Sequence, residues 1–187
     1  MNPQRGTALI IAVMGVCLTA ALGASLVVMT STEMMIAANY VRAKEAGYAA
    51  EAGLEIGMQE LGAQPDWDAV LSGTASSSFA DGAPAGTRSL GDGSVLDITE
   101  LISQTTMENP GWRLFGFGPL RLIQSAQEPQ SDDYVVVWVG SDPTGDTASV
   151  AVRADAFGPA GARRTVEGTA RKSEDGGVRM LSWREIR

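Results

Sequence analysis

The sequence predicts an α+β fold in which a long N-terminal helix packs on a C-terminal antiparallel β-sheet. Residues 6–32 contain no charged side chain, and residues 33–61 contain no proline and have the periodicity of an amphipathic helix. The last third of the chain alternates β-branched runs with glycine-containing turns. Because such a sheet needs a cover over its apolar face, we expect the amphipathic part of the helix to supply it.

The uncharged segment is long enough to cross a membrane, since about 20 apolar residues suffice. We therefore predict a transmembrane half of the helix at residues 7–32. A cleaved secretory signal fits poorly, because its apolar region has only about 7–15 residues. Arg5 precedes the segment and Glu33 is the first charge after it. The positive-inside rule then places the N-terminus in the cytoplasm and the following domain outside.

Residues 33–61 are predicted to continue the same helix without a break. They are rich in alanine, methionine, glutamate and leucine, which favour helices. The whole helix, from residue 7 to 61, would be roughly 80 Å long, and Gly62 and Pro65 would end it. Residues spaced four and three apart mark the expected packed face: Ile36, Tyr40, Ala43, Gly47, Ala50, Leu54, Gly57 and Leu61.

Three motifs in this helix carry a family resemblance: Arg5-Gly6 followed directly by Thr7 and an aliphatic run, EMMIAANYVR at residues 33–42, and YAAEAGL at residues 48–54. At these residues the chain resembles the type IV pilin superfamily, and within it the minor pilins of the PilX-like group. The resemblance implies a pilin-like fold and cleavage by prepilin peptidase between Gly6 and Thr7, with residues 1–6 as the leader. It also implies N-methylation of Thr7, although threonine departs from the usual phenylalanine or methionine there.

The fifth mature position is Ile11. Most major pilins carry a glutamate there, which registers each incoming subunit against its neighbour. Minor pilins of this group, and the tip pseudopilin of type II secretion, resemble this chain in lacking it. The resemblance thus implies a subunit of a priming or tip complex, first in the bacterial inner membrane and then in the pilus, at its tip. Its implied partners are prepilin peptidase, other minor pilins and, as a further candidate, the major pilin.

Two alternatives stay open from the sequence: a tip-type pseudopilin of a type II secretion system, and an uncleaved signal-anchored envelope protein that binds a ligand or partner. A role in cell adhesion is also left open. An enzyme is disfavoured, because the chain has no histidine and no nucleophile beside a recognisable base. Cys17 is the single cysteine, so no intramolecular disulfide can form.

The distribution of charged residues along the chain disfavours one class of partner. All 22 acidic residues follow the uncharged segment, which argues against nonspecific binding of nucleic acid. We expect no cofactor and no metal site. Asp142 and Asp146 could offer oxygen ligands to calcium, but their segment lacks the length and ligand count of an EF-hand loop. An ordinary turn is the preferred interpretation.

The extracytoplasmic domain is predicted at residues 62–187, with strands near 134–139, 147–156, 163–171 and 178–186. The first strand reads as buried on both faces, and Asp175-Gly176 signals the last hairpin. Residues 65–71 should form a short helical turn, in which Trp67 and Leu71 would pin the loop to the core. Residues 72–94 read as an exposed loop, either a binding surface or a linker. For the aromatic segment 112–120 we prefer core packing beneath the sheet over an interface.

Overall fold

The computed structural model describes residues 4–122, 131, 133–142, 144–173 and 177–186. Three predicted features therefore lie partly outside the described residues: positions 1–3 of the leader, Pro143 of the aspartate turn, and Asp175-Gly176 of the last hairpin. The chain divides into two compact units, Met1–Val41 and Arg42–Arg187. Helix α1, Gln4–Ala63, contributes residues to both.

In the first unit, α1 exposes all of its large apolar side chains. Each is more than half exposed between residues 9 and 41. The hydroxyls of Thr19, Ser25, Ser31 and Thr32 donate to backbone carbonyls three or four residues earlier, so their hydrogen bonds are made within the helix. Such internal satisfaction is what a hydrocarbon environment requires. Helix α1 is long and apolar enough to cross a membrane.

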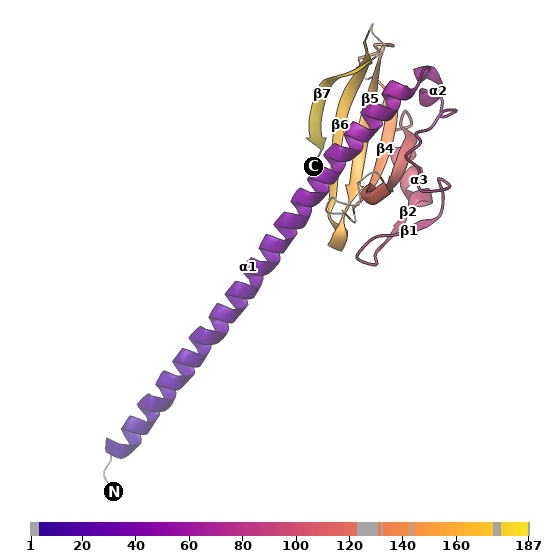
Figure 1. The fold of residues 1–187 in the computed structure, drawn as a ribbon. Helices are drawn as coiled ribbons and strands as arrows, with labels where there is room; N and C mark the ends of the chain where they lie inside the picture. Colours follow the sequence, from indigo (N-terminus) through magenta and orange to yellow (C-terminus); the bar gives the residue numbers. More distant parts are fainter. Residues whose placement is uncertain (1–3, 123–130, 132, 143, 174–176, 187) are drawn as a thin grey trace. The chain divides into compact units, whose positions relative to one another are not determined.

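The second unit is built on a five-stranded antiparallel sheet in the order β3-β4-β5-β6-β7. The long helix and the antiparallel sheet confirm the predicted α+β fold (Figure 1). The strands are β3 Arg113–Pro119, β4 Tyr134–Ser141, β5 Ser149–Phe157, β6 Arg163–Lys172 and β7 Val178–Ile186.

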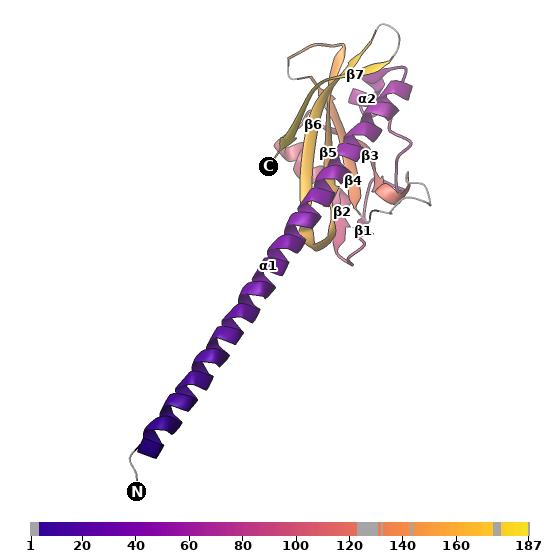
Figure 2. The ribbon, with the colours of Figure 1, turned by 60° about the vertical axis from the view of Figure 1, so that its left-hand side comes forward.

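The last turns of α1 cover one face of this sheet (Figure 2). They pack on alternate residues of β4, β5 and β6, so the sheet presents one valine- and alanine-rich face to the helix. The predicted packed face of the helix is partly wrong. Ile36 and Tyr40 are exposed, and a Cβ added at Gly47 would meet nothing within 4 Å. Burial begins ten residues after Ile36, and the buried apolar side chains of α1 are Ala46, Ala49, Ala50, Leu54, Met58 and Leu61.

A second layer covers the other face, which the sequence did not predict. It consists of helix α3, Ile98–Glu108, and the hairpin of β1, Thr87–Ser89, with β2, Val95–Asp97. Their side chains join Trp138 and its β4 neighbours in a separate apolar cluster. Strand β4 is therefore buried on both faces. The remaining short elements are α2 Trp67–Leu71, η1 Leu120–Leu122 and η2 Pro159–Gly161.

The aromatic segment packs in the core, as we expected, but it does so as a strand of the sheet and not beneath it. Phe115 of β3 is buried in the cluster under α1, and Phe117 in the cluster under α3. Gly116 makes room for the chain outside β3, since a Cβ there would lie 3.0 Å from the Phe79 carbonyl oxygen. Residues 77–81 hydrogen-bond along this edge, with a parallel bridge at Ala80. The edge of β3 is thus occupied.

Strand β7 is the opposite edge and is irregular. We expected Leu181 and Trp183 to share the apolar face of a regular strand. Instead, the pairing with β6 shifts between Thr169 and Ala170, which leaves Leu181 without a partner in the register. Both Leu181 and Trp183 are 49% exposed. A bulge of this kind interrupts the exposed edge of a sheet.

Candidate functional site

The predicted processing residues lie in the first turns of α1. Gly6 and Thr7 both have helical backbone, and Ile11 follows Thr7 by four residues. Residues at this spacing lie on the same side of a helix, one turn apart. The Thr7 and Ile11 side chains are exposed, Ile11 by 66%. Cleavage after Gly6 and methylation of Thr7 stay predictions.

The chemistry of this segment is that of a packing surface. Residues 6–32 contain no charged side chain, and a carboxylate in place of Ile11 would be the only charge among them. The exposed side chains from residue 7 to 32 are apolar or small, or carry hydroxyls, of which those of Thr19, Ser25, Ser31 and Thr32 are bonded within the helix. Such a surface can be covered by lipid or by other apolar helices.

In the second unit, α1 presents an outer face opposite the sheet. Tyr48 is 67% exposed, and Glu51 and Glu55 follow it on the exposed face, one turn apart. The packed face of the same turns contains Gly53 and Gly57. The helix therefore has a carboxylate-bearing outer face and a small-residue inner face.

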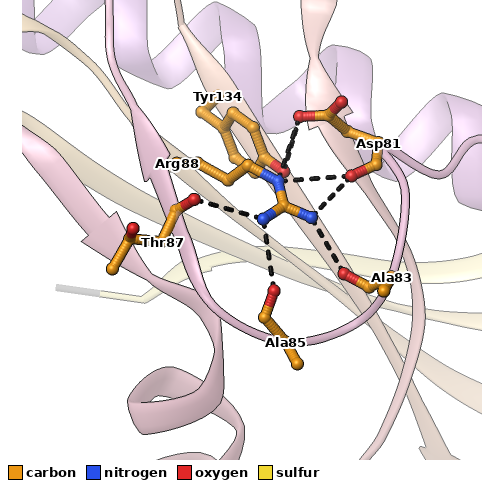
Figure 3. Close-up of polar contacts among 6 residues, drawn as sticks. All are labelled: Asp81, Ala83, Ala85, Thr87, Arg88 and Tyr134. Atoms are coloured by element: carbon orange, nitrogen blue, oxygen red, sulfur yellow. Dashed lines mark hydrogen bonds and ion pairs between the residues drawn. The ribbon is translucent and has the colours of Figure 1, made fainter.

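Arg88 organises the segment that the sequence left as a loop (Figure 3). Its guanidinium donates to the carbonyl oxygens of Asp81, Ala83 and Ala85 at 2.7–3.2 Å, and its Nε lies 3.2 Å from Asp81 Oδ2. Tyr134 donates its hydroxyl to the same carboxylate at 3.4 Å. Burial, together with the Asp81 charge, raises the pKa of Tyr134, so this hydroxyl stays a donor. The segment 81–88 is folded around one arginine.

Glu60 fixes the preceding part of that loop. Its carboxylate accepts hydrogen bonds from the Ser77 hydroxyl at 2.9 Å, and from the Ser78 backbone N–H at 2.7 Å and hydroxyl at 2.9 Å. Burial alone would raise the pKa of Glu60, but these hydrogen bonds outweigh it and hold the pKa below its ordinary value. The end of α1 is thereby tied to residues 77–78, far along the chain.

The aspartates considered for calcium serve as turn acceptors. Asp142 accepts from the Thr144 N–H at 2.8 Å. Asp146 accepts from the Ala148 N–H and from the Ser149 hydroxyl, both at 3.0 Å, and the first of these bonds is the main cause of its lowered pKa. In the part of the chain that the structure describes, no group of three or more His, Cys, Asp or Glu residues is placed to hold a metal ion.

A buried charge cluster went unnoticed in the sequence. The Asp155 side chain is fully buried and accepts from the Trp138 indole N–H at 2.8 Å and from the Thr165 hydroxyl. Arg153 and Arg163 also pair with its Oδ1, at 3.1 and 3.3 Å. In the sequence Asp155 appears only as a polar position in a strand of period two. It becomes the hub of a buried cluster only through its neighbours on adjacent strands, which the sequence does not show.

Comparison with known proteins gives one match. The family model described as PilX N-terminal matches residues 5–55. No curated protein and no solved structure matches the chain. The match begins at Arg5, includes Gly6, Thr7 and Ile11, and ends in the part of α1 that packs on the sheet. It confirms the PilX-like resemblance and supports a structural, type IV pilin-like function anchored in a membrane. The family model thus matches the N-terminal helix of this chain over residues 5–55.

Proposed function

We propose that the protein is a minor pilin of a type IV pilus assembly apparatus, with a mechanical and not a catalytic function. The observation that carries the proposal is the composition of α1: a charge-free half within the PilX N-terminal match, followed by a half that packs into a globular domain. The first half would lie in the inner membrane and later in the filament core. The acidic globular domain would face outward.

Processing is part of this proposal. Prepilin peptidase would cut between Gly6 and Thr7 on the cytoplasmic face and methylate the new N-terminus at Thr7. The family match spans this bond, and a basic residue, Arg5, precedes it. The cut would leave α1 to begin with a charge-free segment. The positive-inside rule supports a cytoplasmic N-terminus.

Ile11 supports a position at the start of a filament. A carboxylate inside an apolar bundle must find a cationic partner, because an unpaired buried charge costs several kcal/mol. A subunit with isoleucine at this position needs no partner above it. We therefore place the protein in a priming or tip complex, with other minor pilins and the major pilin as its neighbours.

The intact mass of the membrane-extracted protein, expressed with and without prepilin peptidase, tests the processing step. We expect loss of residues 1–6 only with the peptidase, plus the mass of one methyl group if Thr7 is modified. Gly6→Val should block the cut. Gly15→Val is the matched control, because it makes the same change where nothing lies within 4 Å of a Cβ, and it should be cut normally. An unchanged N-terminus in both strains would favour the uncleaved signal anchor.

Immunogold labelling of sheared filaments tests the position. Wild-type protein should be found at pilus ends, and Ile11→Glu should shift label into the shaft, because the new carboxylate can pair with a neighbouring N-terminus. Label along wild-type shafts would contradict the tip assignment. Pili without label, in cells whose secretion fails when the protein is deleted, would instead favour a pseudopilin.

A further inference from the structure

A groove of about 480 Å³ lies on the sheet face opposite α1, beside the second layer. Its wall is the turn at residues 109–112, and its floor is formed by β4 to β7. The volume falls in the range of ordinary ligand pockets, about 300–1,000 Å³. We call it the arginine groove, and the lining residues used below are Trp112, Gly140, Arg153, Glu167 and Arg184.

Three charged residues form a row across the floor of the arginine groove. Arg153 is the cross-strand partner of Glu167, which in turn is the partner of Arg184. Arg184 Nη2 lies 2.9 Å from Glu167 Oε1, and its side chain is 70% exposed. Glu167 thus pairs with Arg184, whose guanidinium is accessible from solvent, and has Arg153 as its neighbour on β5.

Arg153, the inner arginine, is only partly neutralised. It shares Asp155 with Arg163, so one carboxylate serves two guanidinium groups. The Nε of Arg153 is buried and has no hydrogen-bond partner among the described residues. Its side chain is 15% exposed. The charged residues that line the arginine groove are two arginines and one glutamate, in a protein whose net charge is −8.

The wall adds an apolar surface beside these charges. Trp112 lies against Gly140 of β4, where a Cβ would be 3.2 Å from the indole ring. The floor next to it is Ala151, which is buried. Guanidinium groups bind carboxylates through paired, charge-assisted hydrogen bonds, and an indole offers an apolar contact beside them.

We propose that the arginine groove binds an acidic peptide segment of a partner protein. An aspartate or glutamate carboxylate of that segment would pair with Arg184 from the solvent side, with an adjacent apolar side chain against Trp112. Charge complementarity selects this occupant, and the groove extends to the edge strand β7, where an extended segment can enter. The inference goes beyond the proposed pilin function and does not rest on it.

Fluorescence anisotropy on the full chain in detergent micelles tests the proposal. The probe is a labelled peptide of alternating glutamate and leucine, compared with the same peptide carrying glutamine in place of glutamate. We expect the glutamate peptide to bind at least about tenfold more tightly, and its affinity to fall as salt is added. Equal binding of the two peptides would overturn the proposal.

Two charge reversals on β7 locate the site. Arg184→Glu should weaken binding of the glutamate peptide by about tenfold or more, because it places a carboxylate beside Glu167. Arg179→Glu makes the same change at an exposed residue of the same strand outside the groove and should leave affinity within about twofold. Equal losses would show nonspecific attraction and overturn the assignment. Arg184→Gln repeats the test should Arg184→Glu lower the melting temperature.

Discussion

Gly53 in α1 lies so close to Val135 in β4 that a Cβ at this position would overlap the valine side chain. Gly57, one turn later, has the same relation to Val137, 2.8 Å from where its Cβ would be. Both valines are fully buried. The two glycines allow the helix backbone to approach a β-branched surface that an alanine-bearing helix would contact only at a greater distance.

The first prediction follows from this contact. Gly53→Ala should lower the free energy of unfolding by about 1–3 kcal/mol, because overpacking forces the helix or Val135 to shift. Gly47→Ala is the control: nothing lies within 4 Å of a Cβ there, and alanine should stabilise the helix by about 0.5–1 kcal/mol. Thermal unfolding followed by tryptophan fluorescence measures both. Equal effects of the two substitutions would contradict the tight contact.

These glycines also explain where sequence reasoning about the helix failed. Periodicity predicted a helix and an apolar stripe, but it could not fix where burial starts. Ile36 and Tyr40 fit the stripe and are exposed, whereas Ala46 and Gly53 are buried. Close approach to the sheet selects small residues, which a hydrophobicity pattern gives little weight. The helix was predictable from sequence, and its contact surface was only partly so.

The sheet, like the helix, was only partly predictable from the sequence. The runs that become β4 to β7 have strong β-branched or alternating patterns, and their antiparallel arrangement was predictable. Strand β3 was missed because Gly116 and Gly118 interrupt its pattern, and glycine is unfavourable in strands unless another backbone approaches closely. The second layer, made of α3 with β1 and β2, was not predicted because it depends on contacts between residues far apart in the chain. The PilX N-terminal match ends at residue 55 and does not include it.

The second prediction concerns the Asp155 cluster. Asp155→Ala would leave the largely buried Arg153 without its carboxylate and Trp138 without its acceptor. We expect a loss of about 3–5 kcal/mol in the free energy of unfolding. Thr165→Val, which removes only one donor to Asp155, should cost about 1 kcal/mol. If Asp155→Ala does not fold, Asp155→Asn should fall between the two. A cost for Asp155→Asn no larger than that of Thr165→Val would refute the hub function.

The third prediction concerns Arg88 and the segment it organises. Arg88→Ala should raise amide hydrogen exchange in residues 81–89 while β4 to β6 stay protected, because the lost bonds are local to that segment. Arg88→Lys keeps the charge but has no planar fork to reach several carbonyls at once, so exchange should rise there too. Unchanged exchange in Arg88→Ala would mean that the segment is held by other contacts. Mass-detected hydrogen exchange provides the measurement.

The last prediction is a pH dependence at Asp92, which joins two distant loops. Its carboxylate accepts from the Ser94 hydroxyl at 2.6 Å and N–H at 2.9 Å, and from the Ala160 N–H at 2.6 Å. Ala160 has a φ of 56°, an unusual conformation for a residue other than glycine.

Bonds to Ser94 first, and to Ala160 next, lower the pKa of Asp92 to about 2. A carboxyl group whose pKa is lower in the folded than in the unfolded state stabilises the fold above the unfolded value of about 3.9, and this contribution is lost as pH falls through the folded value. The melting temperatures of wild type and Asp92→Asn should therefore differ at pH 6 and converge between about pH 4 and pH 2. Asp66→Asn is the matched variant. It makes the same change at an exposed aspartate that caps α2 and is remote from Ala160 in sequence. If the difference in melting temperature between wild type and Asp92→Asn stays constant down to pH 2, the charge of the Asp92 carboxylate does not strengthen the link to Ala160.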